Sequence, residues 1–197
     1  MQRIFYLLLF LFIVESTVAQ NDPYKQTITS WQQNYMAKHE VVKGNDKKYF
    51  RFFPIDASYF VWADLVKIRD TVGFQMRTTQ GTEQHFFKYG TLKFIVMGVP
   101  CKLVVYQSEE LMKTEKYRDY LFVPFTDKTT GAASYPGGRY LEFSSADIQG
   151  NKLKLDFNGA YNPYCAYGSG FHCPIPPKEN GLPVAIRAGE MNFGKKH

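Results

Sequence analysis

The sequence predicts a mainly β protein, an antiparallel β-sandwich or barrel-like domain with one N-terminal α-helix. Two observations carry this prediction. Eight short β-branched or aromatic segments follow one another between residues 59 and 158, and no long helical segment separates them. Strands spaced this closely are typical of antiparallel sandwiches and barrels. The aromatic content of 17% supplies bulky side chains for the core of such a sheet.

The one long helix is expected over residues 23–43. Ile28, Trp31 and Tyr35 recur at three- and four-residue steps, and Gly44 follows as a stop signal. A second, short helical piece is expected at residues 108–117, between two of the strands. Trp31 and Trp62 are both assigned to the core.

The expected strands alternate apolar with polar residues in several places, and glycines punctuate them. Gly90 is interpreted as a break between two strands, and Gly150-Asn151 as a hairpin turn. The segments cover residues 59–68, 73–79, 84–89, 91–97, 101–107, 119–125, 139–144 and 152–158.

The N-terminus has the three-part plan of a secretory signal peptide. Arg3 gives a positive start, Ile4 to Val14 is an unbroken apolar run, and Thr17 to Ala19 supplies small residues for cleavage. A membrane anchor is the alternative, but a span needs about 20 apolar residues. We therefore expect a signal peptide at 1–19, a single mostly-β domain at 20–197 without a transmembrane helix, and export to the periplasm or the exterior.

The formal net charge of +6 admits anionic partners. The lysines are scattered, however, and only Lys47-Lys48 and Lys195-Lys196 are adjacent, which favours a solvated surface. No basic run is interleaved with stacking aromatics, so nucleic acid is not expected as a partner.

Four segments of unusual composition carry a resemblance to a known family. They read FRFFPID, YLFVPFTDKTTGAASYPGGRYLEF, LDFNGAYNPYCAY and HCPIPPKENGLPVAIRAGE. This pattern, from about Trp31 to Glu190, resembles the bacterial family catalogued as domain of unknown function 1684. The chain departs from the usual family pattern at Pro136, where a glycine is common. Because no activity is attached to that family, the resemblance implies relatives and leaves the chemistry open.

The two cysteines of the irregular segment after residue 158 favour a disulfide. Cys165 and Cys173 are separated by seven residues, and an exported protein would meet oxidising conditions. Three alternatives stay open: a zinc site with His172 and a fourth ligand such as His85 or Cys101, a nucleophilic thiol with His172 as its base, or two free thiols. Cys101 itself is expected in the core. The prediction includes no metal and no cofactor.

The polar residues around this segment are the candidate site. Asp156 and Asn158 leave the same face of a strand, and Arg139 follows a Gly-Gly turn. An Arg139–Asp156 pair could be a structural clamp or part of a ligand site. Asp127 is interpreted as a turn residue, and Glu190 as a weaker candidate. The expected concave patch comprises Arg139, Asp156, Asn158 and Asn162, walled by Tyr135, Tyr161 or Tyr164.

The functional prediction is a non-catalytic binding module for a small polar or carbohydrate-like ligand. It depends on the clustered Tyr, Asn, Asp and Arg residues, and on the absence of a P-loop, a dinucleotide fingerprint, a zincin helix and a nucleophile elbow. Two alternatives remain: a hydrolase using Asp156 with Arg139, and a structural or partner-binding envelope protein.

Overall fold

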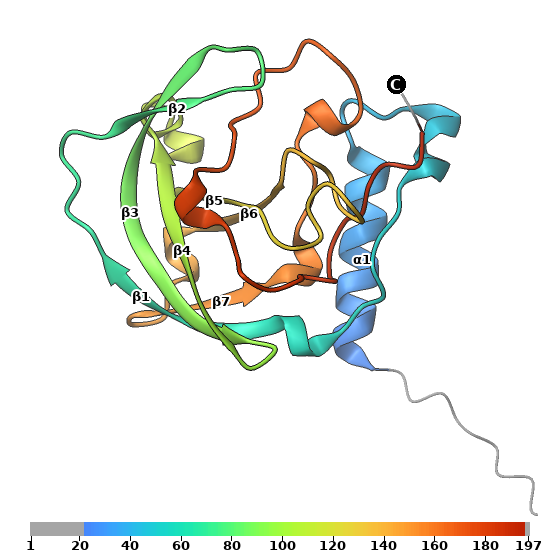
Figure 1. Ribbon diagram of the computed structural model, residues 1–197, viewed down its shortest axis with the longest axis horizontal. Coiled ribbons are helices and arrows are strands. Elements are labelled where there is room, and N and C mark those ends of the chain that lie inside the picture. Colours follow the sequence, from blue (N-terminus) through green and yellow to red (C-terminus); the bar gives the residue numbers. More distant parts are fainter. Residues whose placement is uncertain (1–21, 196–197) are drawn as a thin grey trace, which may run out of the picture.

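The computed structural model describes residues 22–195. The expected signal peptide at 1–19 lies outside the described residues. The protein is mainly β, as predicted, and of the two architectures expected it is the barrel-like one. A single antiparallel sheet of seven strands curls into a half-barrel, and α1 (Pro23–Lys38) stands across its open side (Figure 1).

The strands run in the order β6-β5-β4-β3-β1-β7, with β2 paired to β3. Their bounds are β1 Phe60–Lys67, β2 Phe74–Arg77, β3 Glu83–Val96, β4 Val99–Ser108, β5 Tyr120–Phe125, β6 Arg139–Ser144 and β7 Lys152–Asp156. The short helices are α2 Glu109–Met112 and the 3-10 turns η1 Gly44–Tyr49, η2 Ala57–Tyr59, η3 Glu115–Tyr117, η4 Ser145–Asp147, η5 Phe157–Gly159, η6 Tyr164–Ala166 and η7 Lys178–Asn180.

Gly90 does not separate two strands, so that interpretation was wrong. It lies inside β3, at a register irregularity opposite β4. A Cβ atom at this position would lie 2.7 Å from Leu65 Cδ1 and 2.9 Å from the carbonyl oxygen of Val66. The missing side chain therefore lets β1 approach β3 closely where the sheet curls.

Helix α1 ends five residues before the predicted position. Asp22 caps its N-terminus by accepting from the backbone N–H of Tyr24, and Pro23 fills the first turn. At the other end the Nδ1 atom of His39 accepts from the N–H groups of Val41 and Val42, at 3.3 and 2.9 Å. These bonds turn the chain away from the helix axis.

Within residues 22–195, no helix has both the length and the apolar character needed to cross a bilayer.

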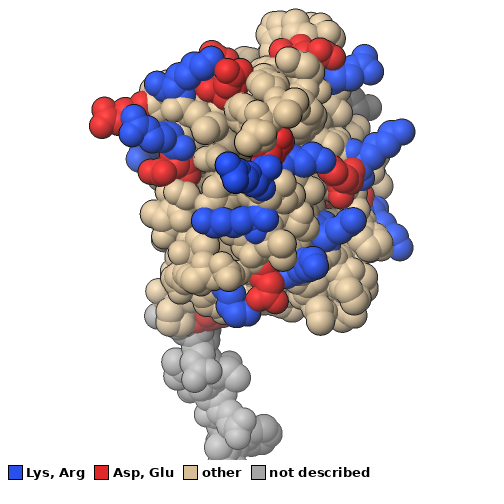
Figure 2. Space-filling view, turned by 90° about the vertical axis from the view of Figure 1, so that its left-hand side faces the viewer, with Lys and Arg blue, Asp and Glu red and all other residues tan. Residues whose placement is uncertain are grey.

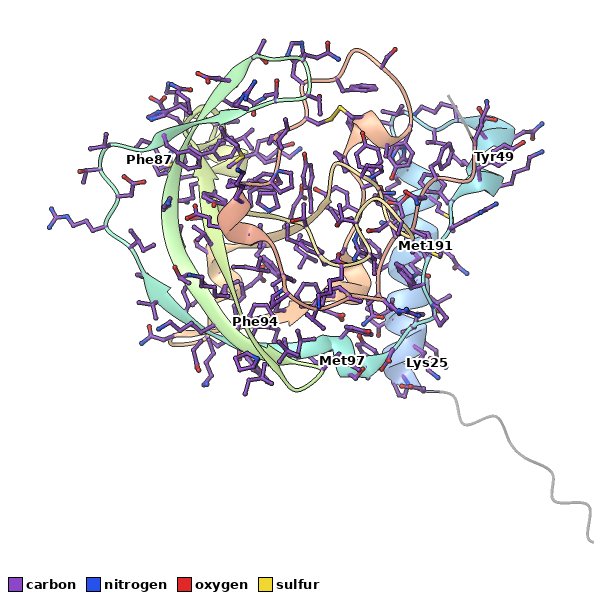
Figure 3. All side chains as sticks on the ribbon, in the orientation of Figure 1. Lys25, Tyr49, Phe87, Phe94, Met97 and Met191 are labelled. Atoms are coloured by element: carbon purple, nitrogen blue, oxygen red, sulfur yellow. A yellow bond between two sulfur atoms is a disulfide. The ribbon has the colours of Figure 1, made fainter. Side chains whose placement is uncertain are left out.

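The main core fills the concave side of the sheet, where the C-terminal segments also lie (Figure 3). Leu92, Leu103, Val123 and Leu155 are fully enclosed there. A second cluster occupies the other face of the strands near Pro174, whose carbonyl oxygen accepts from the Tyr140 hydroxyl. Its buried members are Met76, Phe86, Val104, Tyr106, Phe122 and Tyr140.

The join between β4 and β5 depends on a side chain. The two strands share one paired position, Tyr106 with Phe122. Beyond it the Asn180 amide accepts from the Val104 N–H at 2.7 Å, and donates to the carbonyl oxygens of Val104 and Pro124 at 2.9 and 2.8 Å. Pro124 has no N–H to offer a neighbouring strand. The Asn180 side chain therefore replaces the missing backbone pairs.

Candidate functional site

Arg139 forms a buried clamp with Asp127. Its side chain is fully buried, and its Nη2 atom lies 2.8 Å from Asp127 Oδ2. The same guanidinium donates to the carbonyl oxygens of Ile186, Ala188 and Glu190. Arg139 therefore fastens the C-terminal segment against β6, and Asp127 is its counter-ion as well as a turn residue.

The expected Arg139–Asp156 pair is not formed. Asp156 accepts from the Tyr24 hydroxyl at 3.0 Å and from the backbone N–H of Asn158 at 2.9 Å. The Asn158 amide donates to the Tyr24 hydroxyl oxygen and to the Asp56 carbonyl oxygen, both at 2.8 Å. These bonds tie the first turn of α1 to the end of β7, which is a structural arrangement.

Asn162 belongs to a buried polar cluster around Glu190. The Glu190 carboxylate accepts from the Asn162 backbone N–H at 2.9 Å, the Tyr167 hydroxyl at 2.7 Å and the Tyr35 hydroxyl at 3.2 Å. Burial raises the pKa of Glu190 to about 7, although these donors favour the ionised form. Arg139 reaches only the backbone oxygen of Glu190. The cluster holds α1, through Tyr35, to the C-terminal segment.

The three tyrosines expected as walls all pack near α1, Tyr161 against Tyr35 and Tyr164 against His39. Tyr135 packs with the aromatic cluster near α1 and closely against Gly137. Tyr161 donates to the Glu142 carboxylate. Tyr164 is 37% exposed and donates to Glu40 at 3.0 Å. Most of the residues predicted as one concave site therefore make hydrogen bonds within the protein that hold the fold together.

Cys165 and Cys173 form the expected disulfide, and Cys101 is the buried free cysteine of the described chain. Both sulfurs of the pair are used by the bridge, so they are not free to bind zinc or to act as nucleophiles. Within the described chain, no three His, Cys, Asp or Glu side chains are grouped as a metal site.

Replacing both Cys165 and Cys173 with serine is expected to lower the free energy of unfolding by about 2–3 kcal/mol, because the bridge restricts the unfolded chain. Urea titration of the oxidised protein and the variant measures this difference. Dithiothreitol should lower the stability of the wild type and leave the variant unchanged. Three alkylatable thiols in the oxidised wild type would contradict the bridge.

A cleft of about 980 Å³ opens elsewhere on the described surface, and none of the residues of the expected patch lines it. It is lined mainly by outward-facing residues of β1, β3 and β4, together with residues of η7 and of the segment that follows it. Its walls are Val61, Trp62, Asp64, Lys93, Phe94, Ile95, Pro100, Cys101, Lys102, Glu179, Gly181 and Pro183. Figure 2 looks onto the side of the molecule where β3 lies in Figure 1, and Lys and Arg side chains spread across its middle.

Trp62 is the main aromatic group of this cleft. It is 46% exposed, so its assignment to the core was wrong. The Lys154 ammonium lies 5.2 Å from the centre of the Trp62 ring and faces it from β7. The sequence held a signal for this exposure, because Trp62 and Asp64 are two residues apart on one strand and therefore share a face. A charged residue marks that face as the outer one.

The comparisons with known proteins agree with the fold and leave the activity open. The family described as "Protein of unknown function (DUF1684)" matches residues 48–191. A solution NMR structure of an uncharacterized protein of Haloarcula marismortui is 29% identical, with a TM-score of 0.63, over 86% of this chain and 94% of that one. No curated protein matches the chain. The chain therefore belongs to the family of unknown function DUF1684.

Proposed function

We propose that the protein is a non-catalytic binding module for a carbohydrate-like ligand, and that the outer-face cleft at Trp62 is its site. The half-exposed Trp62 ring is the observation that carries this proposal. A flat aromatic face suits the apolar face of a sugar ring, and tryptophan is among the residues that contribute most to binding interfaces. Asp64 and Lys93 beside it supply polar partners for hydroxyl groups.

The two alternatives have less support. The hydrolase hypothesis needed Arg139 beside Asp156, and Arg139 is fully buried against Asp127 instead. An envelope protein with a purely structural role has no need of a cleft, whereas this one has a large cleft with an exposed tryptophan. The binding hypothesis accounts for the cleft and its exposed Trp62, which the buried clusters described above do not explain.

Replacing Trp62 with alanine is expected to weaken glycan binding by roughly 2 kcal/mol, about thirtyfold, because a central aromatic contact is lost. A glycan array followed by calorimetry on the best neutral oligosaccharide measures this effect. The fold should be retained, since Trp62 lies on the solvent face.

The matched control is Tyr117→Ala, which removes an aromatic side chain of similar exposure, 37%, away from the cleft. It should bind as the wild type does. Equal binding by wild type and Trp62→Ala, or no binding to any glycan, would refute the proposal.

We also propose that the protein works outside the cytoplasm. The signal-like N-terminus and the Cys165–Cys173 disulfide support this location, because such bridges persist in oxidising compartments. Protein purified from its native host should begin near Gln20 or Asn21. A chain that retains Met1 and fractionates with the cytoplasm would refute export.

A further inference from the structure

Two lysines in the cleft face each other across a hairpin. Lys93 of β3 and Lys102 of β4 are direct cross-strand partners, and both line the cleft. Side chains in such positions leave the sheet about 5 Å apart, and like charges there destabilise the pairing. The arrangement therefore has an electrostatic cost in the free protein.

The neighbouring carboxylates form their close ion pairs with other lysines. Asp64 lies opposite Lys93, but its carboxylate is 2.6 Å from the Lys152 ammonium. Glu179 is 2.9 Å from the Lys88 ammonium. Within the described chain, no carboxylate oxygen lies within 4.0 Å of either cleft lysine, so neither lysine forms an ion pair, although Glu179 attracts Lys102 at longer range.

We propose that the ligand is an acidic glycan and that Lys93 and Lys102 bind its carboxylate group. This inference rests on the proposed function and adds the class of ligand. An anion between the two ammonium groups removes their repulsion and gains two charge-assisted contacts. Lys93 and Lys102 are level with Asp64, two residues along β1 from Trp62, and lie one and two strands away, so they are on the order of 8–12 Å from Trp62. A uronate ring on Trp62, or the next ring of the chain, brings its carboxylate to that position.

The apolar residues of the same face argue against a plain polyanion. Ile95 is 64% exposed beside the two lysines, and Trp62 is 46% exposed. A linear polyphosphate would contact the lysines and leave these apolar surfaces in water. A sugar acid has both an apolar ring face and a charge, which matches the cleft.

The probes are oligogalacturonate and its methyl ester, which share one backbone and differ in charge. The wild type is expected to bind the acid about tenfold more tightly than the ester at low salt. The double variant Lys93→Gln/Lys102→Gln should bind both forms equally. The control Lys25→Gln/Lys38→Gln removes the same charge from exposed positions on α1, and should keep the preference.

The outcomes separate this inference from the proposed function. If the wild type binds the acid and the ester equally, and Trp62→Ala binds neither, the ligand is not selected for its charge. The inference of an acidic glycan is then overturned, while the proposed glycan site at Trp62 stands. Loss of the preference in the α1 control, or polyphosphate binding as tight as oligogalacturonate and unaffected by Trp62→Ala, would reduce the effect to general charge attraction and overturn the inference. Binding of neither probe, together with a blank neutral glycan array, would refute both.

Discussion

Replacing Arg139 with methionine is expected to lower the free energy of unfolding by about 3–5 kcal/mol, because it leaves Asp127 as a buried charge without its partner. The change also removes the donors for the Ile186, Ala188 and Glu190 carbonyl oxygens. Chemical denaturation monitored by tryptophan fluorescence measures the loss.

Two further variants test the reason for this effect. Arg139→Lys should recover only part of the stability, because one ammonium group cannot reach Asp127 and three carbonyl oxygens together. Arg77→Met, at an exposed position of β2, should stay near the wild-type value. A loss below about 1 kcal/mol in Arg139→Met, the range of an exposed ion pair, would contradict the clamp.

Glu190 is expected to make the protein less stable as the pH rises. Its pKa is about 7 in the folded protein, against an ordinary value of 4.5, so the folded state binds the proton more tightly than the unfolded chain. Its contribution to stability therefore falls between pH 4.5 and 7, by about 3 kcal/mol in total. The free energy of unfolding of wild type and Glu190→Gln, measured from pH 4 to 8, gives this contribution as their difference.

The difference between the two proteins is needed because His39 acts in the opposite direction. Burial lowers the pKa of His39 to about 4, so its contribution to stability increases as the pH rises from 4 to 6.5. Glu110→Gln, at an exposed position of α2, is the control and should follow the wild-type profile. A constant difference between wild type and Glu190→Gln across this range would show that Glu190 does not titrate there.

The strands could be predicted because their pattern is local. The segments at 59–68, 101–107, 119–125 and 139–144 lie within one or two residues of β1, β4, β5 and β6. The position of Gly90 was predicted wrongly because it depends on the close approach of Leu65, which lies on another strand. The end of α1 was predicted wrongly because the His39 side chain accepts hydrogen bonds from the residues that follow the helix. The turn at Gly150-Asn151 does form, with two bonds between Gln149 and Lys152, but β6 and β7 then go to opposite ends of the sheet.

The candidate site was harder to predict because it depends on contacts between residues that are far apart in the sequence. The disulfide followed from short spacing, and Arg139 was correctly identified as a clamp candidate, yet its partner is Asp127, 12 positions earlier in the chain. The scattered lysines suggested only a solvated surface. Strand pairing brings Lys152, Lys93 and Lys102 to one face, and no linear pattern reveals this.

The Asn180 bridge between β4 and β5 sets an order of events during synthesis. The strands from β1 to β4 emerge from the ribosome first, and β5 and β6 follow, but the two groups meet at a single paired position until Asn180 arrives. A nascent chain that still lacks this residue holds two half-sheets with an open seam between them. Completion of the sheet between β4 and β5 therefore waits for one of the last segments of the chain to be made.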